Sequence, residues 1–254
     1  MKKEGHGEGS FLDRHVMWNI LYPPRCPVCD RLLDRSRRAE DKRAGVCQIC
    51  LSYGRPERIR EPLCKRCGKP LSDETEAYCL DCRRQKHLFL EGRGAFAYRG
   101  MEESMYRFKN QNRRCYADFF GEELFLALQG VLGRWKPQVL VPVPIHRERR
   151  RRRGYNQAEL LTRGLSARTG IPSDPRLLFR VRRTRVQASL DDRERRKNVK
   201  GAFAVRDDVC PYQRILLVDD IYTTGSTADA ASQALLHAGA EKIFCASVCI
   251  GKGL

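Results

Sequence analysis

The stretch ILLVDDIYTTGST, residues 215–227, joins a run of apolar residues to two adjacent acids and a short Thr/Gly/Ser turn. The apolar run predicts a buried strand, and Gly225 lies just ahead of a helical pattern that begins at Ser226. Free backbone N–H groups where a turn leads into a helix bind anions, and phosphate suits them best. Asp219 and Asp220 would repel the phosphate itself, but carboxylates accept hydrogen bonds from hydroxyl groups or bind Mg²⁺. The stretch therefore predicts a site for a sugar phosphate, most simply a ribose 5-phosphate.

Predicted strands and helices alternate through the C-terminal two thirds of the chain. Strand patterns occupy 94–100, 138–144, 201–205, 214–220 and 242–250, and helical patterns occupy 101–113, 115–132, 155–170 and 226–240. This alternation predicts an α/β fold with a mostly parallel sheet and flanking helices.

Ligands of such sheets bind at the carboxyl ends of the strands, and three segments meet that condition. They are Val141–Pro144 with the basic loop after it, the turn after Asp219 and Asp220, and the long polar stretch 183–203. We expect the last of these to be a mobile flap over the site.

Eight of the twelve cysteines form four C-x-x-C pairs before residue 83. Seventeen residues separate the first two pairs and eleven separate the last two, a spacing typical of two tandem zinc ribbons with structural Cys₄ sites. A redox dithiol would use one such pair in a βαβ context. Sequential and interleaved pairing both remain open. The eight predicted ligands are Cys26, Cys29, Cys47, Cys50, Cys64, Cys67, Cys79 and Cys82.

The cysteine distribution divides the chain into two predicted domains. Residues 10–90 hold a short helix over 11–21 and the double zinc ribbon, and residues 91–254 hold the α/β unit. The N-terminus lacks the pattern of a signal peptide, and no apolar run is long enough to cross a bilayer, so we expect a cytoplasmic protein.

The formal net charge of +18 favours polyanionic partners, either nucleic acid or phosphorylated metabolites. The basic run Arg149–Arg153 is equally consistent with a pyrophosphate contact and with attraction of single-stranded nucleic acid.

The stretch 215–227 resembles, without a gap, the phosphoribosyl-pyrophosphate (PRPP) motif of type I phosphoribosyltransferases. From about residue 16 to residue 251 the chain resembles the ComF family, which is linked to competence and DNA uptake. The resemblance is carried by YPPRCPVC (22–29), VPVPIHRERRRRRGYNQAELL (141–161), RTRVQASLDDRERRKNVKGAF (183–203) and the PRPP stretch.

This resemblance implies a type I phosphoribosyltransferase-like fold and a role for each motif residue. Asp219 and Asp220, the catalytic acids of the motif, would contact the ribose hydroxyls, and Arg153 would meet the pyrophosphate. The remaining PRPP-binding residues would be Val143 in the pyrophosphate loop, Thr223, Thr224, Gly225, Ser226 and Thr227 around the 5-phosphate, and Gln187, Arg195 and Asn198 in the flap.

Two functions remain open at this stage. The first is a Mg²⁺-dependent transfer of the phosphoribosyl group to an acceptor that the sequence does not identify, because no general base for a nucleobase stands out. The second is a non-catalytic protein that uses its zinc ribbons and basic surface to bind single-stranded DNA, a helicase or another partner of the DNA-uptake machinery.

Overall fold

The computed structural model describes residues 23–33, 45–54, 56–182, 199 and 201–251. The predicted helix over 11–21 lies outside these residues. The predicted flap residues Gln187, Arg195 and Asn198 lie outside them as well.

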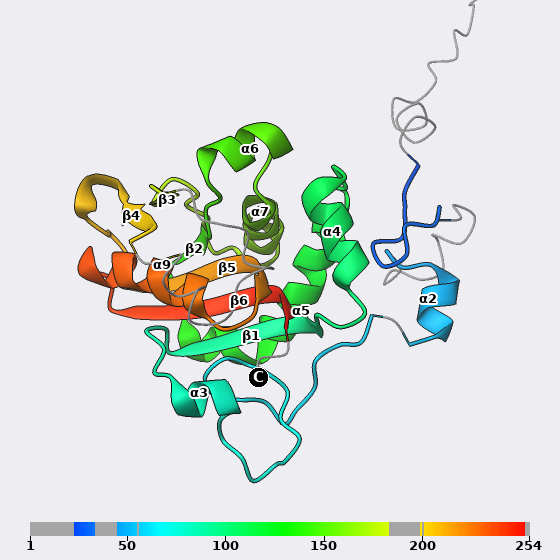
Figure 1. The fold of residues 1–254 in the computed structure, drawn as a ribbon, viewed down its shortest axis with the longest axis horizontal. Helices are drawn as coiled ribbons and strands as arrows, with labels where there is room; N and C mark the ends of the chain where they lie inside the picture. The colour runs from blue at the N-terminus through cyan, green and yellow to red at the C-terminus, as the bar shows by residue number, and fades with distance from the viewer. Residues whose placement is uncertain (1–22, 34–44, 55, 183–198, 200, 252–254) are drawn as a thin grey trace, which may run out of the picture.

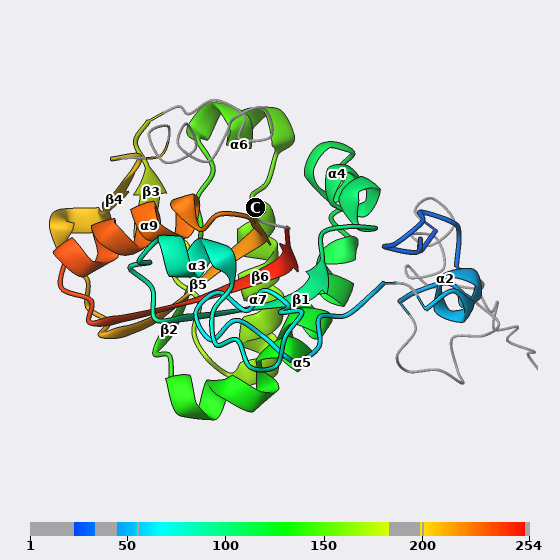
Figure 2. The same ribbon diagram turned by 60° about the horizontal axis from the view of Figure 1, so that its bottom comes forward.

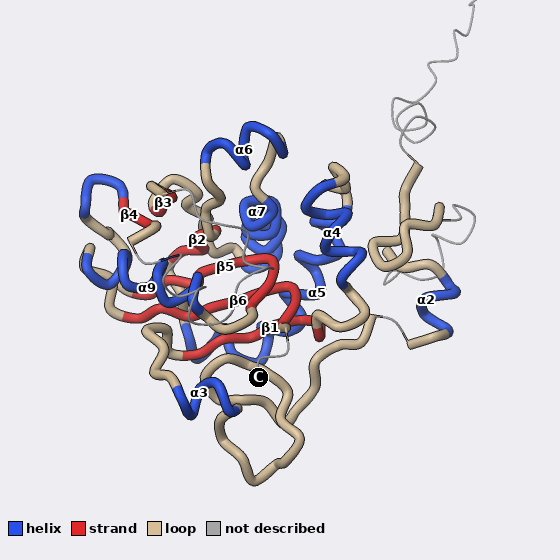
Figure 3. Tube along the Cα trace, viewed as in Figure 1, coloured by secondary structure: helices blue, strands red, loops and turns tan. Residues whose placement is uncertain are grey.

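Four parallel strands form the central sheet (Figures 1 and 3). Their spatial order is β1 (Glu91–Ala97), β6 (Lys242–Ile250), β5 (Arg214–Tyr222) and β2 (Val139–Pro142). Each neighbouring pair is parallel. Strands β5 and β6 are central and almost wholly buried, as expected of a parallel sheet covered on both faces. The predicted α/β fold is confirmed.

Helices cover both faces of this sheet. Helices α5 (Tyr116–Trp135) and α7 (Gln157–Thr169) pack on one face, and α9 (Ser226–His237) packs on the other (Figure 2). Alternate residues of β5 serve the two layers: Leu216 and Val218 belong to the apolar cluster with α5 and α7, whereas Ile215 and Leu217 belong to the cluster with α9.

Two local predictions were wrong. The stretch 201–205 does not join the parallel sheet, because β4 (Phe203–Val205) pairs antiparallel with β3 (Leu178–Arg180) in a separate two-stranded sheet. The burial of alternate residues in β4, rather than of all of them, fits such a ribbon.

The basic segment after Pro144 is a helix rather than a loop. Helix α6 (Arg147–Arg153) begins where the His146 ring accepts a hydrogen bond from the Glu148 N–H, and it ends at Gly154 with φ +79°. Arginine has a high helix propensity, so a capped run of this residue forms a helical turn readily.

The first cysteine pairs lie against α4 (Glu102–Asn110) and α5. The carboxylate of Asp30 accepts hydrogen bonds from the Tyr116 hydroxyl at 2.5 Å and from the Arg113 guanidinium at 2.8 Å. A short helix, α2 (Gln48–Ser52), begins directly after Cys47 and lies beyond α4 in Figure 1.

The last two cysteine pairs lie against the edge strand β1. A Cβ on Gly68 would lie 2.6 Å from the Gly92 carbonyl oxygen, so only glycine permits the observed approach of the two backbones. Gly68 also has φ +74°, which glycine adopts without strain. A second short helix, α3 (Leu80–Arg84), begins after Cys79 and lies beside β1 and α9 in Figure 2.

Candidate functional site

The eight cysteines of the four C-x-x-C pairs gather into two clusters. One holds Cys26, Cys29, Cys47 and Cys50, and the other holds Cys64, Cys67, Cys79 and Cys82, with all sulfur atoms of a cluster within 4.8 Å of one another. The pairing is therefore sequential, one of the two arrangements that the spacing allows.

The sulfur geometry of both clusters fits zinc. The Sγ atoms of Cys29 and Cys47 lie 3.5 Å apart and those of Cys67 and Cys79 lie 3.6 Å apart. Four thiolates at about 2.3 Å from a tetrahedral Zn²⁺ lie about 3.8 Å from one another. Each cluster supplies four thiolates and no open position, so both are structural zinc-ribbon sites.

The two acids of the PRPP-like stretch lie at the carboxyl end of the sheet. Strand β5 includes both acids, as predicted, and continues two residues further to Tyr222, because Ile221 and Tyr222 stay in register with β6. Strand β2 ends opposite Val218, and the Val143 N–H that follows it donates to the Val218 carbonyl at 2.9 Å. Asp219 is therefore the first residue of β5 beyond the end of β2.

The turn after β5 has the geometry of an anion-binding loop. Gly225 has φ +81° and is the N-cap of α9, and its carbonyl accepts the first helical hydrogen bond from the Asp229 N–H at 2.8 Å. The backbone N–H groups of the helix's first turn have no acceptor within the helix. Hydroxyl residues surround these amides, since Thr223, Thr224, Ser226 and Thr227 flank Gly225.

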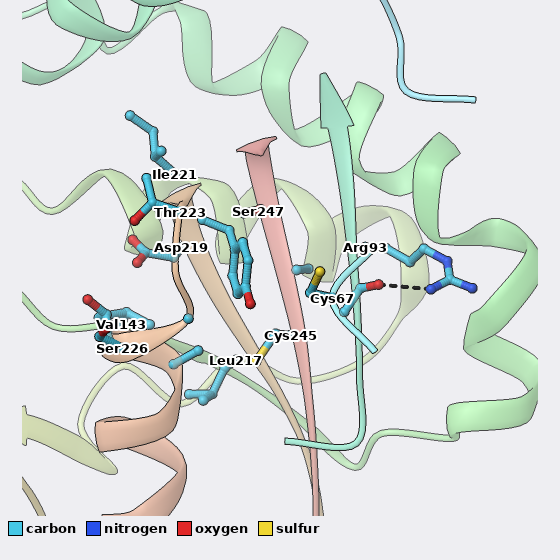
Figure 4. A pocket seen from close by; sticks show the side chains of 16 residues that line it. Cys67, Arg93, Val143, Leu217, Asp219, Ile221, Thr223, Ser226, Cys245 and Ser247 are labelled. Carbon is cyan, nitrogen blue, oxygen red and sulfur yellow. Dashed lines mark hydrogen bonds between the residues drawn. The ribbon is translucent and has the colours of Figure 1, made fainter. Parts of the chain in front are cut away.

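Six of the nine predicted ligand-binding residues that the structure describes line one pocket (Figure 4). Asp219, Thr223, Val143 and Ser226 lie close together in this view, at the end of β5 and the start of α9. Those of the predicted site residues that line the pocket are Val143, Asp219, Thr223, Gly225, Ser226 and Thr227.

Three predicted residues lie near this pocket without lining it. Thr224 is buried and its hydroxyl lies 2.8 Å from that of Ser226, so it supports the loop from within. Asp220 is on the opposite side of β5, where its carboxylate lies 2.9 Å from the Lys109 ammonium. Arg153 donates a hydrogen bond to Gln157 at 2.5 Å and is close enough to feel the charge of Asp220.

The acids and bases of the site perturb one another. Burial raises the pKa of Asp219 to about 7, and the neighbouring Asp220 charge adds to this effect. Burial lowers the pKa of the Arg180 guanidinium to about 10, and the charge of Asp219 opposes this effect. Burial likewise lowers the pKa of Arg153, against the pull of Asp220. Such groups occur where a protein binds charged ligands.

Sequence reasoning missed Lys109 and Arg180 as neighbours of the acid pair. Lys109 lies in α4 and Arg180 in β3, far from β5 in sequence, and no motif marks either residue. It also missed that His87 and Asp229 lie behind the turn, with the His87 Nδ1 atom 2.8 Å from an Asp229 carboxylate oxygen.

The structure thus defines a parallel α/β protein that carries a double zinc ribbon and, at the carboxyl end of its sheet, a pocket lined by Asp219 and the turn after β5. Among the described residues, none of the helices has the length and apolar character that a membrane span requires.

Known proteins that are similar in sequence support the presence of the double zinc ribbon and show the family of the chain. The model of the double zinc ribbon domain matches residues 17–83. The chain is 35% identical over 206 residues to Competence protein F of Haemophilus influenzae, covering 78% of this chain and 87% of the relative. It is 30% identical over 201 residues to Competence protein ComFC of Bacillus subtilis, covering 76% and 79%. It is 29% identical over 206 residues to DNA utilization protein YhgH of Salmonella typhimurium, covering 78% and 87%. The chain belongs to the family of Competence protein F.

Proposed function

We propose that the pocket at the end of β5 binds PRPP. The observation that carries this proposal is the continuity of Asp219, the Gly225 turn and the first turn of α9 around one pocket. The amides at the start of α9 would hold the 5-phosphate, and Asp219 and Asp220 would accept hydrogen bonds from the ribose hydroxyls.

The charges around the acids support a ligand with several negative groups. Lys109, Arg153 and Arg180 approach the acid pair from three different elements. A pyrophosphate group beside the ribose would meet these cations, and their partial burial would strengthen the attraction. Val143 lies at the end of β2 on the pocket wall, the position proposed for the pyrophosphate loop.

The reaction that fits such a site is phosphoribosyl transfer. The bond between ribose C1 and the pyrophosphate oxygen would break, pyrophosphate would leave with the electron pair, and an acceptor atom would form the new bond to C1. Asp219 and Asp220 are the residues whose oxygens suit Mg²⁺, which would offset the charge of the pyrophosphate. The described part of the chain offers no dedicated base for one acceptor, so the acceptor class stays open.

The names of the relatives bear on the cellular role of this chain and not on its chemistry. Two of them are named competence proteins and a third a DNA utilization protein, which supports a role of this chain in DNA uptake. The protein would act there as a PRPP-binding component whose zinc ribbons are structural.

A thermal-shift experiment tests the proposal. PRPP with Mg²⁺ should raise the Tm of the wild-type protein, because a ligand that binds only the native state stabilises it. It should leave the Tm of the Asp219→Asn/Asp220→Asn variant unchanged. An equal shift in both proteins would place the ligand elsewhere, and the absence of any shift in the wild type would overturn the proposal. A pyrophosphate-release assay with nucleobases, amines and DNA oligomers would then identify an acceptor.

A second candidate function rests on helix α6. Its sequence RERRRRR places arginine at every position but one, and most of these side chains are exposed. Such a helix, in a protein that also carries zinc ribbons, suits single-stranded DNA or an acidic protein partner. Affinity for a single-stranded DNA oligomer should then fall steeply between low and physiological salt. An affinity that is independent of salt would exclude this electrostatic mode.

A further inference from the structure

The cluster of Cys64, Cys67, Cys79 and Cys82, hereafter the second knuckle, is connected to the anion-binding turn by a short chain of contacts. The chain segment that leaves the knuckle through α3 turns back onto the start of α9. There the Asp229 carboxylate accepts hydrogen bonds from the Leu88 N–H at 2.9 Å and the Gln85 side chain at 3.1 Å, and lies 2.8 Å from His87 Nδ1. One carboxylate thus binds three groups of this segment.

Asp229 is also the residue that closes the first turn of α9. Its N–H donates to the Gly225 carbonyl at 2.8 Å, so the position of Asp229 sets the direction of the amides between these two residues. A carboxylate held by the 85–88 segment therefore orients the part of the backbone that would face a phosphate.

The His87 ring lies directly against the turn. Its side chain is fully buried, and it stacks on Phe89 with ring centroids 4.8 Å apart. A Cβ on Gly225 would lie 2.7 Å from His87 Cε1 and 2.7 Å from the Tyr222 hydroxyl. The Gly225 turn is thus shaped by the surfaces of His87 and Tyr222.

The partners of the two His87 ring nitrogens define which nitrogen donates and which accepts when the ring is neutral. Because the Asp229 carboxylate can only accept, Nδ1 carries the proton and donates it. The Nε2 atom, 3.4 Å from the Tyr222 hydroxyl, is then the acceptor of a long hydrogen bond from that group. The ring joins α9 to the end of β5 across the back of the turn.

The second knuckle is itself fixed to the sheet. The Gly68 backbone touches Gly92 of β1, and the buried Lys69 pairs with Asp81 of α3. By contrast, the first knuckle (Cys26, Cys29, Cys47 and Cys50) contacts α4 and α5 through Asp30, away from α9.

We propose that the second knuckle, acting through His87 and Asp229, positions the anion-binding turn, and that the first knuckle does not. His87 and Asp229 are positioning residues that act on a ligand through the Gly225 turn. Loss of zinc from the second knuckle releases the 85–88 segment, and the turn then samples conformations that cannot hold a phosphate. This inference rests on the proposed function for the identity of the ligand, but not for the ordering of the turn.

The first experiment needs no ligand. Hydrogen exchange of the Asp229 N–H, which donates to the Gly225 carbonyl, should speed up in the free His87→Ala variant and much less in His87→Asn, whose amide can replace Nδ1–H as donor to Asp229. The matched control is His237→Ala, an exposed histidine at the other end of α9, which should leave exchange at the turn unchanged. Equal exchange in His87→Ala and the wild type would overturn the inference, whether or not the protein binds PRPP.

The second experiment uses ribose 5-phosphate as the probe. If only a tenth of the molecules hold the turn in its phosphate-binding conformation, the Kd for ribose 5-phosphate rises about tenfold. We expect this rise for His87→Ala and for Cys82→Ser, and less than a twofold change for Cys29→Ser, which removes one ligand of the first knuckle. If Cys82→Ser does not fold, the comparison of His87→Ala with His87→Asn decides, since both retain the zinc ligands. Equal losses in the two cysteine variants would contradict the inference. A wild type that fails to bind PRPP and ribose 5-phosphate would contradict the proposed function instead.

Discussion

The ammonium of Lys109 lies 2.9 Å from a carboxylate oxygen of Asp220, and this ion pair joins helix α4 to the carboxyl end of β5. Both side chains are largely buried, with 26% and 13% of their surfaces exposed, so water screens the pair only in part. The pair places a cation next to two adjacent acids in the ligand-free protein.

Lys109→Met should therefore destabilise the protein in a pH-dependent way. Without the ammonium, the charged Asp220 has lost its close partner and repels Asp219 more strongly. We expect a loss of about 1–2 kcal/mol in the free energy of unfolding at pH 8 and a smaller loss near pH 4. Urea unfolding of the variant and the wild type at both pH values measures the difference in the free energy of unfolding. Lys109→Arg is the charge-conserving control. Equal losses at the two pH values would show that packing, not charge, dominates.

Asp219→Asn should stabilise the protein at alkaline pH. The native pKa of about 7 lies above the usual 3.8, so the native state binds this proton more tightly than the unfolded state. Stability from this group is therefore present below about pH 4 and is lost as the pH rises towards 7. Removing the charge should add up to about 4 kcal/mol at pH 8 and little at pH 4. The exposed Asp208→Asn is the control, and a gain of the same size at both pH values would refute the assignment.

The affinity for PRPP, if the pocket binds it, should rise with pH. Ribose hydroxyls and Mg²⁺ both favour the ionised carboxylate, whereas the free protein holds Asp219 protonated below about pH 7. Below pH 7 the Kd should therefore increase about tenfold for each unit of decreasing pH, with protons released on binding. Calorimetry in two buffers of different ionisation enthalpy measures the released protons. Proton uptake would give the opposite sign and exclude Asp219 as a ligand.

Gly68→Ala should destabilise the protein far more than Gly54→Ala. Gly68 has φ +74° and Gly54 has φ +63°. An alanine at either position therefore introduces a similar backbone strain of about 1–2 kcal/mol. Only at Gly68 would the new Cβ also meet backbone, 2.6 Å from the Gly92 carbonyl oxygen, whereas nothing lies within 4 Å at Gly54. Thermal unfolding of the zinc-loaded variants compares the two. A similar decrease in Tm would mean that the second knuckle moves away from β1 at little cost.

Local patterns predicted most of the elements. The apolar run before Asp219, the helical spacing after Ser226 and the glycine stop near residue 170 correspond to β5, α9 and the end of α7. These signals are local because burial on one face and the conformational preference of glycine act over a few residues. The same reasoning placed 201–205 in the wrong sheet, because a short strand does not specify its partner.

Apart from Val143, which the family resemblance supplied, the pocket residues that were predicted lie along one segment. Residues 219–227 share a strand, a turn and a helix start, so their proximity follows from chain connectivity. Lys109 and Arg180 reach the acids from distant elements, and the Asp229 contacts with the 85–88 segment span more than a hundred residues. Contacts between segments so far apart in the chain produce no periodicity or spacing in the sequence from which they could be predicted.

By itself, the sequence determined the two metal-binding segments, the α/β alternation and the turn that follows the paired acids. Each of these depends on the spacing of residue types along the chain, which sets which two thiolates form one C-x-x-C knuckle and which residues can share one face. The tertiary structure decided that the thiolates pair sequentially, that Asp219 and Asp220 face opposite sides of β5, and that His87 stands behind Gly225. Those features depend on how separate elements pack, and packing is a property of the whole folded chain rather than of any short segment.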